Sequence, residues 1–186
     1  MMKNLKTYRQ LFESVGELTP EQIEWLDECI DGTWTLNPQT GLVDVDGDFG
    51  CSRMDLPDFK DVRFGVVSGY FYCYGNQLTT LEGAPQRVGR NFRCDNNQLT
   101  SLVGAPQDVE GDFYCGDNPV SEETLDNIFY RMTEGESYIK AVESLWSKIP
   151  LEDQVLLYRP EFEWVSPEER RKLEALKAYH GFKGMI

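Results

Sequence analysis

Four cysteines recur at nearly regular intervals, which is a pattern that invites a search for a metal site. They are Cys51, Cys73, Cys94 and Cys115, four of the five cysteines in a chain of 186 residues. A tetrahedral zinc site must gather four sulfurs about 2.3 Å from one ion. If each cysteine lies on its own strand of one sheet, neighbours are about 4.8 Å apart and the row is roughly 14 Å long. We therefore expect no metal and no cofactor.

Buried structural thiols are the interpretation that we favour for these cysteines, because a small apolar thiol fills a core well. Disulfides between neighbouring strands are compatible with the usual Cα distances. An odd number of cysteines would still leave one of them unpaired.

Other residue patterns that carry chemistry are sparse. His180 is the only histidine, which excludes a histidine-based triad and a multi-histidine metal site. The segment 44–48 begins like a calcium loop, but an EF-hand needs Gly at position 6 and Glu at position 12, where this chain has Phe49 and Asp55. The chain has no phosphate-binding glycine loop, GxSxG or HExxH. We therefore expect a protein that is not an enzyme.

The regular cysteines belong to a repeat of 21 residues. Residues 67–87 read VSGYFYCYGNQLTTLEGAPQR, and residues 88–108 read VGRNFRCDNNQLTSLVGAPQD. Residues 109–120 begin a further copy, and residues 45–59 hold a degraded copy that lies 22 residues before the next. Such self-similarity predicts a solenoid in which each copy stacks on its neighbours.

Strand alternation assigns each repeat position to one face of a sheet. With a period of two, Phe71 and Cys73 point to one face and the tyrosines around them to the other. We expect the repeated Phe and Cys positions to face inward, together with the leucines of the same copy. The asparagines that follow each strand are expected to form a buried ladder on backbone groups: Asn76, Asn97 and Asn118.

The segment FxCxxNxLTxL resembles the LxVxxNxLTxL core of the short leucine-rich repeats of bacterial effector proteins. The period lies within the 20–29 residues typical of leucine-rich repeats. The resemblance implies an α/β solenoid with a parallel sheet of about four rungs. Val and Phe are four residues apart here, where the bacterial repeat spaces its apolar pair by three, so a related β-solenoid is the alternative. No segment resembles the ubiquitin-ligase domain of some bacterial relatives.

Helical patterns on both sides of the repeat predict the caps that a solenoid needs at its ends. A capping box at residues 19–22 begins a helix that Gly32 is expected to end, and TWTLNPQTGLVDV alternates like a hairpin. After the repeat, helices are predicted for 121–132, 136–149, 151–158 and 166–181. The chain thus divides into an N-terminal cap (1–44), a solenoid (45–120) and a C-terminal helical cap (121–186).

The charge of the chain excludes several classes of partner. With 32 acidic and 18 basic side chains the net charge is −14, which opposes binding to nucleic acid or to an anionic membrane. No apolar run approaches the roughly 20 residues that span a bilayer, and the N-terminus lacks the apolar stretch of a secretory signal. We expect a soluble cytoplasmic protein, and its oligomeric state stays open.

The outward positions of the repeat differ from copy to copy, whereas the inward ones hardly change. Tyrosine and arginine, which are enriched where interfaces gain energy, are frequent among them. High β-propensity of tyrosine is the purely structural alternative. Four strands of five residues give a surface of about 20 by 16 Å, under half of the roughly 800 Å² that each partner buries in a standard interface. We predict that a protein or peptide binds here, through Tyr70, Tyr72, Tyr74, Asn91, Arg93, Asp95, Asp112 and Tyr114.

A second hypothesis starts from residues 6–14, KTYRQLFES, which resemble the N-terminal capsid-targeting peptide of internal head proteins of tailed phages. Leu11-Phe12-Glu13 fits a Leu-x-Glu prohead-protease site. The resemblance implies a phage-encoded, head-packaged protein directed at a host target, found in the virion or the host cytoplasm. An ordinary amphipathic helix is the alternative for this segment. An enzyme without a recognisable motif is the third hypothesis.

Overall fold

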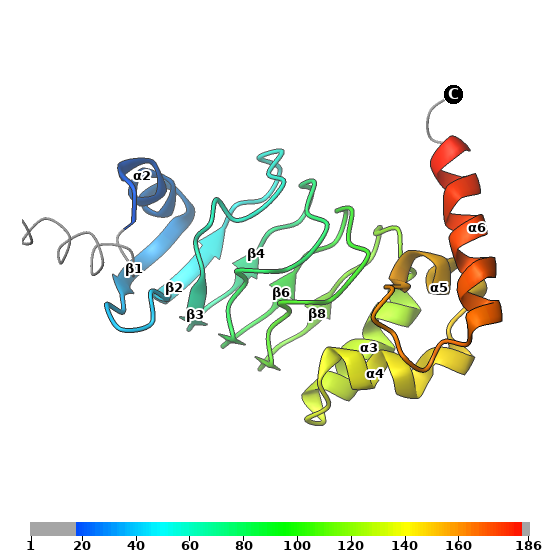
Figure 1. The fold of residues 1–186 in the computed structure, drawn as a ribbon. Helices are drawn as coiled ribbons and strands as arrows, with labels where there is room; N and C mark the ends of the chain where they lie inside the picture. Colours follow the sequence, from blue (N-terminus) through cyan, green and yellow to red (C-terminus); the bar gives the residue numbers. More distant parts are fainter. Residues whose placement is uncertain (1–17, 184–186) are drawn as a thin grey trace, which may run out of the picture.

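The computed structural model describes residues 18–183, with side chains up to Ala178. The peptide 6–14, for which the phage hypothesis was formed, lies outside the described residues, and so does the side chain of His180. The described chain is a parallel-strand β-solenoid of about three turns with helices at both ends (Figure 1). This confirms the prediction of a solenoid capped by helices.

The helices lie before and after the repeat, as the sequence predicts. The N-terminal part consists of α2 (Pro20–Cys29), β1 (Ile30–Leu36) and β2 (Val43–Gly50). The repeat supplies six short strands, β3 (Phe64–Val67), β4 (Phe71–Tyr72), β5 (Arg87–Val88), β6 (Phe92–Arg93), β7 (Asp108–Val109) and β8 (Phe113–Tyr114). The C-terminal part consists of α3 (Glu122–Thr133), α4 (Tyr138–Leu145), a 3₁₀ turn (Trp146–Lys148), α5 (Leu151–Leu157) and α6 (Pro167–Lys183).

Strand β2 organises the sheet. It pairs with β1 antiparallel, Ile30 opposite Phe49, and it pairs in parallel with both β3 and β4. Two parallel series continue from it, β3-β5-β7 and β4-β6-β8, so each repeat crosses the sheet as two short strands separated by a bend. The extended part of each repeat is therefore longer than the single five-residue strand that the sequence predicted.

The start of the hairpin also differs from the expectation. Helix α2 ends at Cys29 and β1 follows at once, so Gly32 lies inside a strand and does not end the helix. Gly32 lies opposite Gly47 with a φ of 142°, and a Cβ at this position would be only 2.2 Å from the carbonyl oxygen of Asp46. Two glycines are needed because the strands approach too closely for side chains there.

A column of phenylalanine rings forms the centre of the core. The ring centroids of Phe49, Phe71, Phe92 and Phe113 follow one another at 4.7, 5.4 and 5.5 Å, and all four rings are nearly parallel. Phe129 of α3 adds a further ring to the column, 3.8 Å from Phe113. At the other end Trp25 of α2 meets Phe49 edge-on at 5.5 Å. Aromatic residues of the flanking helices therefore close both ends of the column.

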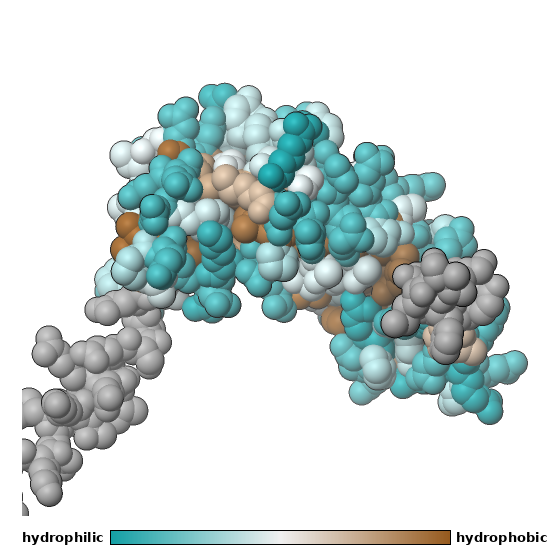
Figure 2. Space-filling model, turned by 90° about the horizontal axis from the view of Figure 1, so that it is seen from above, coloured by the Kyte–Doolittle hydropathy of each residue, from teal (hydrophilic) through white to brown (hydrophobic). Residues whose placement is uncertain are grey.

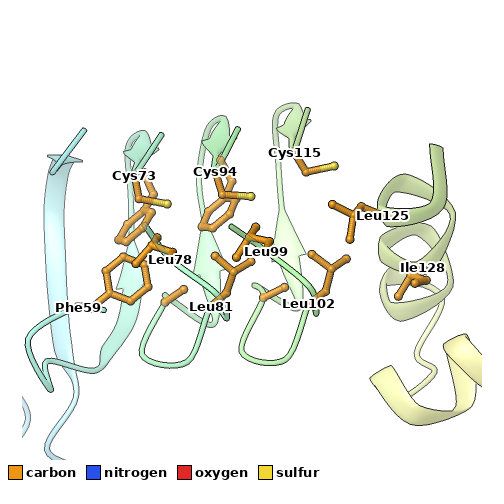
Figure 3. Packing of buried hydrophobic residues seen from close by; sticks show 14 of the residues in the cluster. Phe59, Cys73, Leu78, Leu81, Cys94, Leu99, Leu102, Cys115, Leu125 and Ile128 are labelled. Carbon is orange, nitrogen blue, oxygen red and sulfur yellow. The ribbon is translucent and has the colours of Figure 1, made fainter. Parts of the chain in front are cut away.

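The repeated cysteines and leucines lie in rows beside this column. Figure 3 shows Cys73, Cys94 and Cys115 in line and the leucines below them, with the helix that carries Leu125 and Ile128 closing the end. All five cysteines are buried, and none forms a disulfide. Among the described residues, no group of acidic, histidine or cysteine side chains is arranged to hold a metal ion. The inward position predicted for the cysteines is confirmed.

Burial should make these thiols unreactive in the folded protein. It raises the pKa of Cys29 to about 11 and raises the pKa of Cys73 and Cys94 well above the usual value. At pH 8 we expect Ellman's reagent to label less than one thiol per chain within minutes, and all five in denaturant. The raised pKa values also make the stability depend on pH. Above pH 9 the unfolded chain releases thiol protons that the folded chain keeps, so the free energy of unfolding should fall as the pH rises. Rapid labelling of the native chain would contradict the buried row.

The predicted asparagine ladder is confirmed, and it joins neighbouring turns. Asn97 accepts a hydrogen bond from the backbone N–H of Leu78 at 3.1 Å and donates to the carbonyl oxygens of Cys73 and Cys94, both at 3.0 Å. Asn76 and Asn118 make the equivalent bonds one turn before and one turn after. Each asparagine thus satisfies backbone groups of two turns where the strands end.

A buried carboxylate of α5 ties that helix to the start of α3, the first helix after the solenoid. Asp153 of α5, which is 2% exposed, accepts hydrogen bonds from the backbone N–H and the hydroxyl of Ser121 and from the hydroxyl of Thr124 at 2.6 Å. Ser121 is the N-cap of α3, so Asp153 also lies near the positive end of that helix dipole.

Removal of this carboxylate should loosen the C-terminal cap. For Asp153→Ala we expect the free energy of unfolding to fall by about 2 kcal/mol, because buried donors on α3 lose a charged acceptor. Urea denaturation followed by tryptophan fluorescence would measure this loss. Glu152→Ala, at an exposed neighbouring position, is the control and should change stability by less than about 0.5 kcal/mol. Equal stability of the two variants would exclude the fastening role.

Candidate functional site

The predicted outward residues lie together on one face of the sheet. Tyr72, Arg93 and Tyr114 are in register across β4, β6 and β8. Backbone hydrogen bonds place Tyr74 and Asp95 two residues further along their rungs, and Tyr70, Asn91 and Asp112 lie two residues before. We call this surface, together with Arg53 and Arg90 described below, the tyrosine–arginine face.

Three tyrosines of one repeat form a continuous aromatic row. The rings of Tyr70 and Tyr72 stack with centroids 5.2 Å apart, and Tyr74 meets Tyr72 edge-on at 6.4 Å. Partial burial, and then the neighbouring Tyr70, raise the pKa of the Tyr72 phenol. All three phenols lie on the same side because alternate residues of a strand share a face.

Arg93 connects this row with the next repeats. Its guanidinium donates two hydrogen bonds of 2.9 Å to the carboxylate of Asp95, which raises the pKa of Arg93. The same guanidinium lies over two aromatic rings, 4.6 Å from the centroid of Tyr74 and 5.6 Å from that of Tyr114. Tyr114 in turn donates its hydroxyl proton to Asp112 at 3.1 Å. Because these side chains hold one another in place, less conformational entropy is lost when a partner binds to them.

Asn91 has a structural task within the same face. Its side-chain oxygen accepts a hydrogen bond from the backbone N–H of Asp112 at 3.1 Å. Asp48 does the same for the N–H of Tyr70 at 2.8 Å, two turns earlier. These side chains form hydrogen bonds to the backbone of the next turn at the bend between the two short strands of a repeat. Asn91 is therefore less available to a ligand than the tyrosines are.

Two arginines that the sequence reasoning missed also belong to this face. Arg90 places its guanidinium 5.1 Å from the ring centroid of Tyr70 and donates to the Tyr70 hydroxyl at 3.4 Å. Arg53 lies 5.5 Å from the ring centroid of Tyr74. Strict alternation would place residue 90 inward, but the bend between β5 and β6 turns it outward. The repeat itself carries the signal, because the aligned positions hold Gly69 and Gly111.

The outward surface is larger than predicted because each repeat crosses the sheet as two strands. A rung spans about ten residues, or roughly 33 Å, and β2 together with the about three turns stacked on it gives about 20 Å of width. The first half of the rungs adds the exposed Val66, the ion pair of Arg87 with Asp108 at 3.0 Å, and a hollow of about 300 Å³ lined in part by Thr33 and Ser68. The combined area approaches the roughly 800 Å² of one partner's side in a standard interface.

Other surfaces of the described chain have fewer features that indicate a binding site. A hollow of about 550 Å³ lies between the return bend at residues 104–107 and the α3–α4 connection and includes Met132 and Tyr138. The face seen in Figure 2 is mostly hydrophilic, with hydrophobic residues in a narrow band. None of the helices within residues 18–183 is both long and apolar enough to span a membrane.

Comparison with known proteins gives no match to a family model, a curated protein or a solved structure. The structural class is therefore defined by geometry alone, as a parallel-strand β-solenoid with flanking helices.

Proposed function

We propose that this chain is a protein-recognition module that binds a protein or peptide on the tyrosine–arginine face and does not catalyse a reaction. The observation that carries the proposal is the arrangement of Tyr70, Tyr72, Tyr74 and Tyr114 around Arg93. Tyrosine and arginine are the side chains most often found where interfaces gain energy. Here they stack on one another and are held by hydrogen bonds within the face.

The proposal includes the relation to short leucine-rich repeats and the count of about four rungs. The asparagine ladder at the strand ends and the parallel series β4-β6-β8 support this relation. A cytoplasmic location is also part of the proposal, and it is supported by five buried thiols, since unpaired cysteines are typical of reducing compartments.

Substitution of the aromatic residues tests the function. We expect the combined variant Tyr72→Ala, Tyr74→Ala and Tyr114→Ala to recover at least about tenfold less partner from lysate of the source cells than the unchanged protein, since single interface tyrosines contribute about 1–2 kcal/mol. Quantitative mass spectrometry measures the recovery. Tyr130→Ala is the matched control, because Tyr130 is 63% exposed on α3 and outside the face. If the folded triple variant captures the same proteins in the same amounts, the proposed function is wrong.

A further inference from the structure

Two arginines at opposite ends of the tyrosine row have hydrogen-bond donors that the described residues leave largely unused. Arg90 donates one long hydrogen bond, to the hydroxyl of Tyr70, and Arg53 donates none from its side chain within residues 18–183. Neither forms an ion pair with a carboxylate of the described chain, and both side chains are exposed. A guanidinium has five N–H donors in a planar fork that fits a carboxylate.

The carboxylates of the same face are already engaged. Asp95 accepts both hydrogen bonds of Arg93, and Asp48 accepts the backbone N–H of Tyr70. Asp112 accepts the hydroxyl proton of Tyr114. The hydrogen-bond donors that the described residues leave unused on this face therefore belong to Arg53 and Arg90, although the whole chain carries a charge of −14. A partner that completes these contacts must bring anionic groups to Arg53 and Arg90.

The spacing of these cations indicates the form of the partner. Arg90 lies over Tyr70 and Arg53 lies over Tyr74, and these tyrosines are four residues apart on one rung. That separation corresponds to about 13 Å along a strand. An extended peptide places its residues i, i+2 and i+4 on one side with the same spacing. Acidic side chains at i and i+4 would reach the two guanidinium groups, and the side chain at i+2 would lie over Tyr72.

We infer that the tyrosine–arginine face binds an extended peptide segment with acidic side chains four residues apart and an apolar or aromatic side chain midway between them. The inference rests on the proposed function, since it names the partner of the same face. A carboxylate can pair with each guanidinium while the guanidinium keeps its contact with the tyrosine ring. The aromatic row beneath supplies apolar contact area that is already ordered.

An unbiased peptide library tests this inference. The full chain would be used to select from displayed random nonapeptides, and we expect enrichment of acidic pairs at spacing i, i+4. The selected peptide should bind the Arg53→Gln/Arg90→Gln variant about tenfold more weakly, from roughly threefold for each exposed ion pair. Lys140→Gln, an exposed cation on α4, is the control with unchanged affinity. Fluorescence anisotropy at low and high salt measures both.

Different outcomes would contradict the acidic-peptide inference and the proposed binding face. Selected peptides without paired acids, whose affinity depends on Tyr72 but not on the two arginines, would overturn the acidic-peptide inference and leave the binding face intact. Binding that also ignores the tyrosine substitutions, or a selection that enriches no common pattern, would overturn the inference together with the use of this face.

Discussion

Replacement of Asn97 by alanine is expected to lower the free energy of unfolding by about 4 kcal/mol, a large fraction of the total stability of a typical domain. The side chain is 2% exposed and makes four hydrogen bonds to the backbone of two turns. Alanine removes the acceptor of the Leu78 N–H and a donor shared by the carbonyls of Cys73 and Cys94. Each buried group left without a partner costs about 1–3 kcal/mol.

The position of an asparagine in the ladder should set the size of the effect. Asn118 is less buried than Asn97, so water can replace part of its bonds and Asn118→Ala should cost less. Gln98→Ala is the control, because Gln98 is exposed on the same turn and its side chain makes no hydrogen bond among the described residues. Urea denaturation followed by circular dichroism measures all three variants. A loss for Asn97→Ala as small as that for Gln98→Ala would show that the ladder does not hold the turns together.

The inward half of the fold could be predicted from the sequence because each turn repeats the same packing problem. Phe71 packs between phenylalanines on both sides, and so do Phe92 and Phe113. A substitution at one of these positions therefore changes the packing of its neighbours. The same reasoning identified the cysteines as buried and the asparagines as a ladder. It worked because stacked turns make the environment of a position depend on the period and little else.

The departures arise where the backbone leaves the strict alternation on which the prediction depended. The bend between the two short strands of each repeat reverses the direction that strict alternation gives residue 90, so Arg90 was left out of the predicted outward set. Gly32 was read as a helix end because glycine commonly has that role, whereas the close approach of β1 and β2 requires glycine there. Both misassignments concern contacts between strands, which local pattern does not contain.

The sequence predicted which tyrosines share the outward face, but not which residues of the site contact one another. Alternation alone placed Tyr70, Tyr72 and Tyr74 on one face. Arg93 lies between Tyr74 and Tyr114 because of the register of the rungs and its ion pair with Asp95. Arg53 reaches Tyr74 because of the path of the turn after β2. These contacts join residues from different repeats, which is why the size and the charge of the site emerged only from the fold.

The bend next to the site leads to the second large prediction, for Gly69. A Cβ at this position would lie 1.9 Å from the side-chain oxygen of Asp48 and 2.6 Å from the carbonyl oxygen of Gly47. Asp48 cannot withdraw without losing its hydrogen bond to the N–H of Tyr70. We therefore expect Gly69→Ala to lower the free energy of unfolding by about 3 kcal/mol and to disturb the aromatic row, because Tyr70 follows directly. Thermal unfolding monitored by circular dichroism measures the loss.

Gly50→Ala is the matched control for this prediction, because a Cβ there meets nothing within 4 Å and the residue lies on the same sheet. The comparison also explains why the next repeat can carry Arg90 where this one needs glycine. On the turn before Arg90, the residue that corresponds to Asp48 is Tyr70, which does not fold back onto the next backbone as Asp48 and Asn91 do. A short polar side chain on one turn thus requires glycine on the next, whereas a tyrosine leaves room for an arginine that stacks on it. If Gly69→Ala and Gly50→Ala unfold at the same temperature, this coupling between turns is wrong, and the position of Arg90 needs another cause.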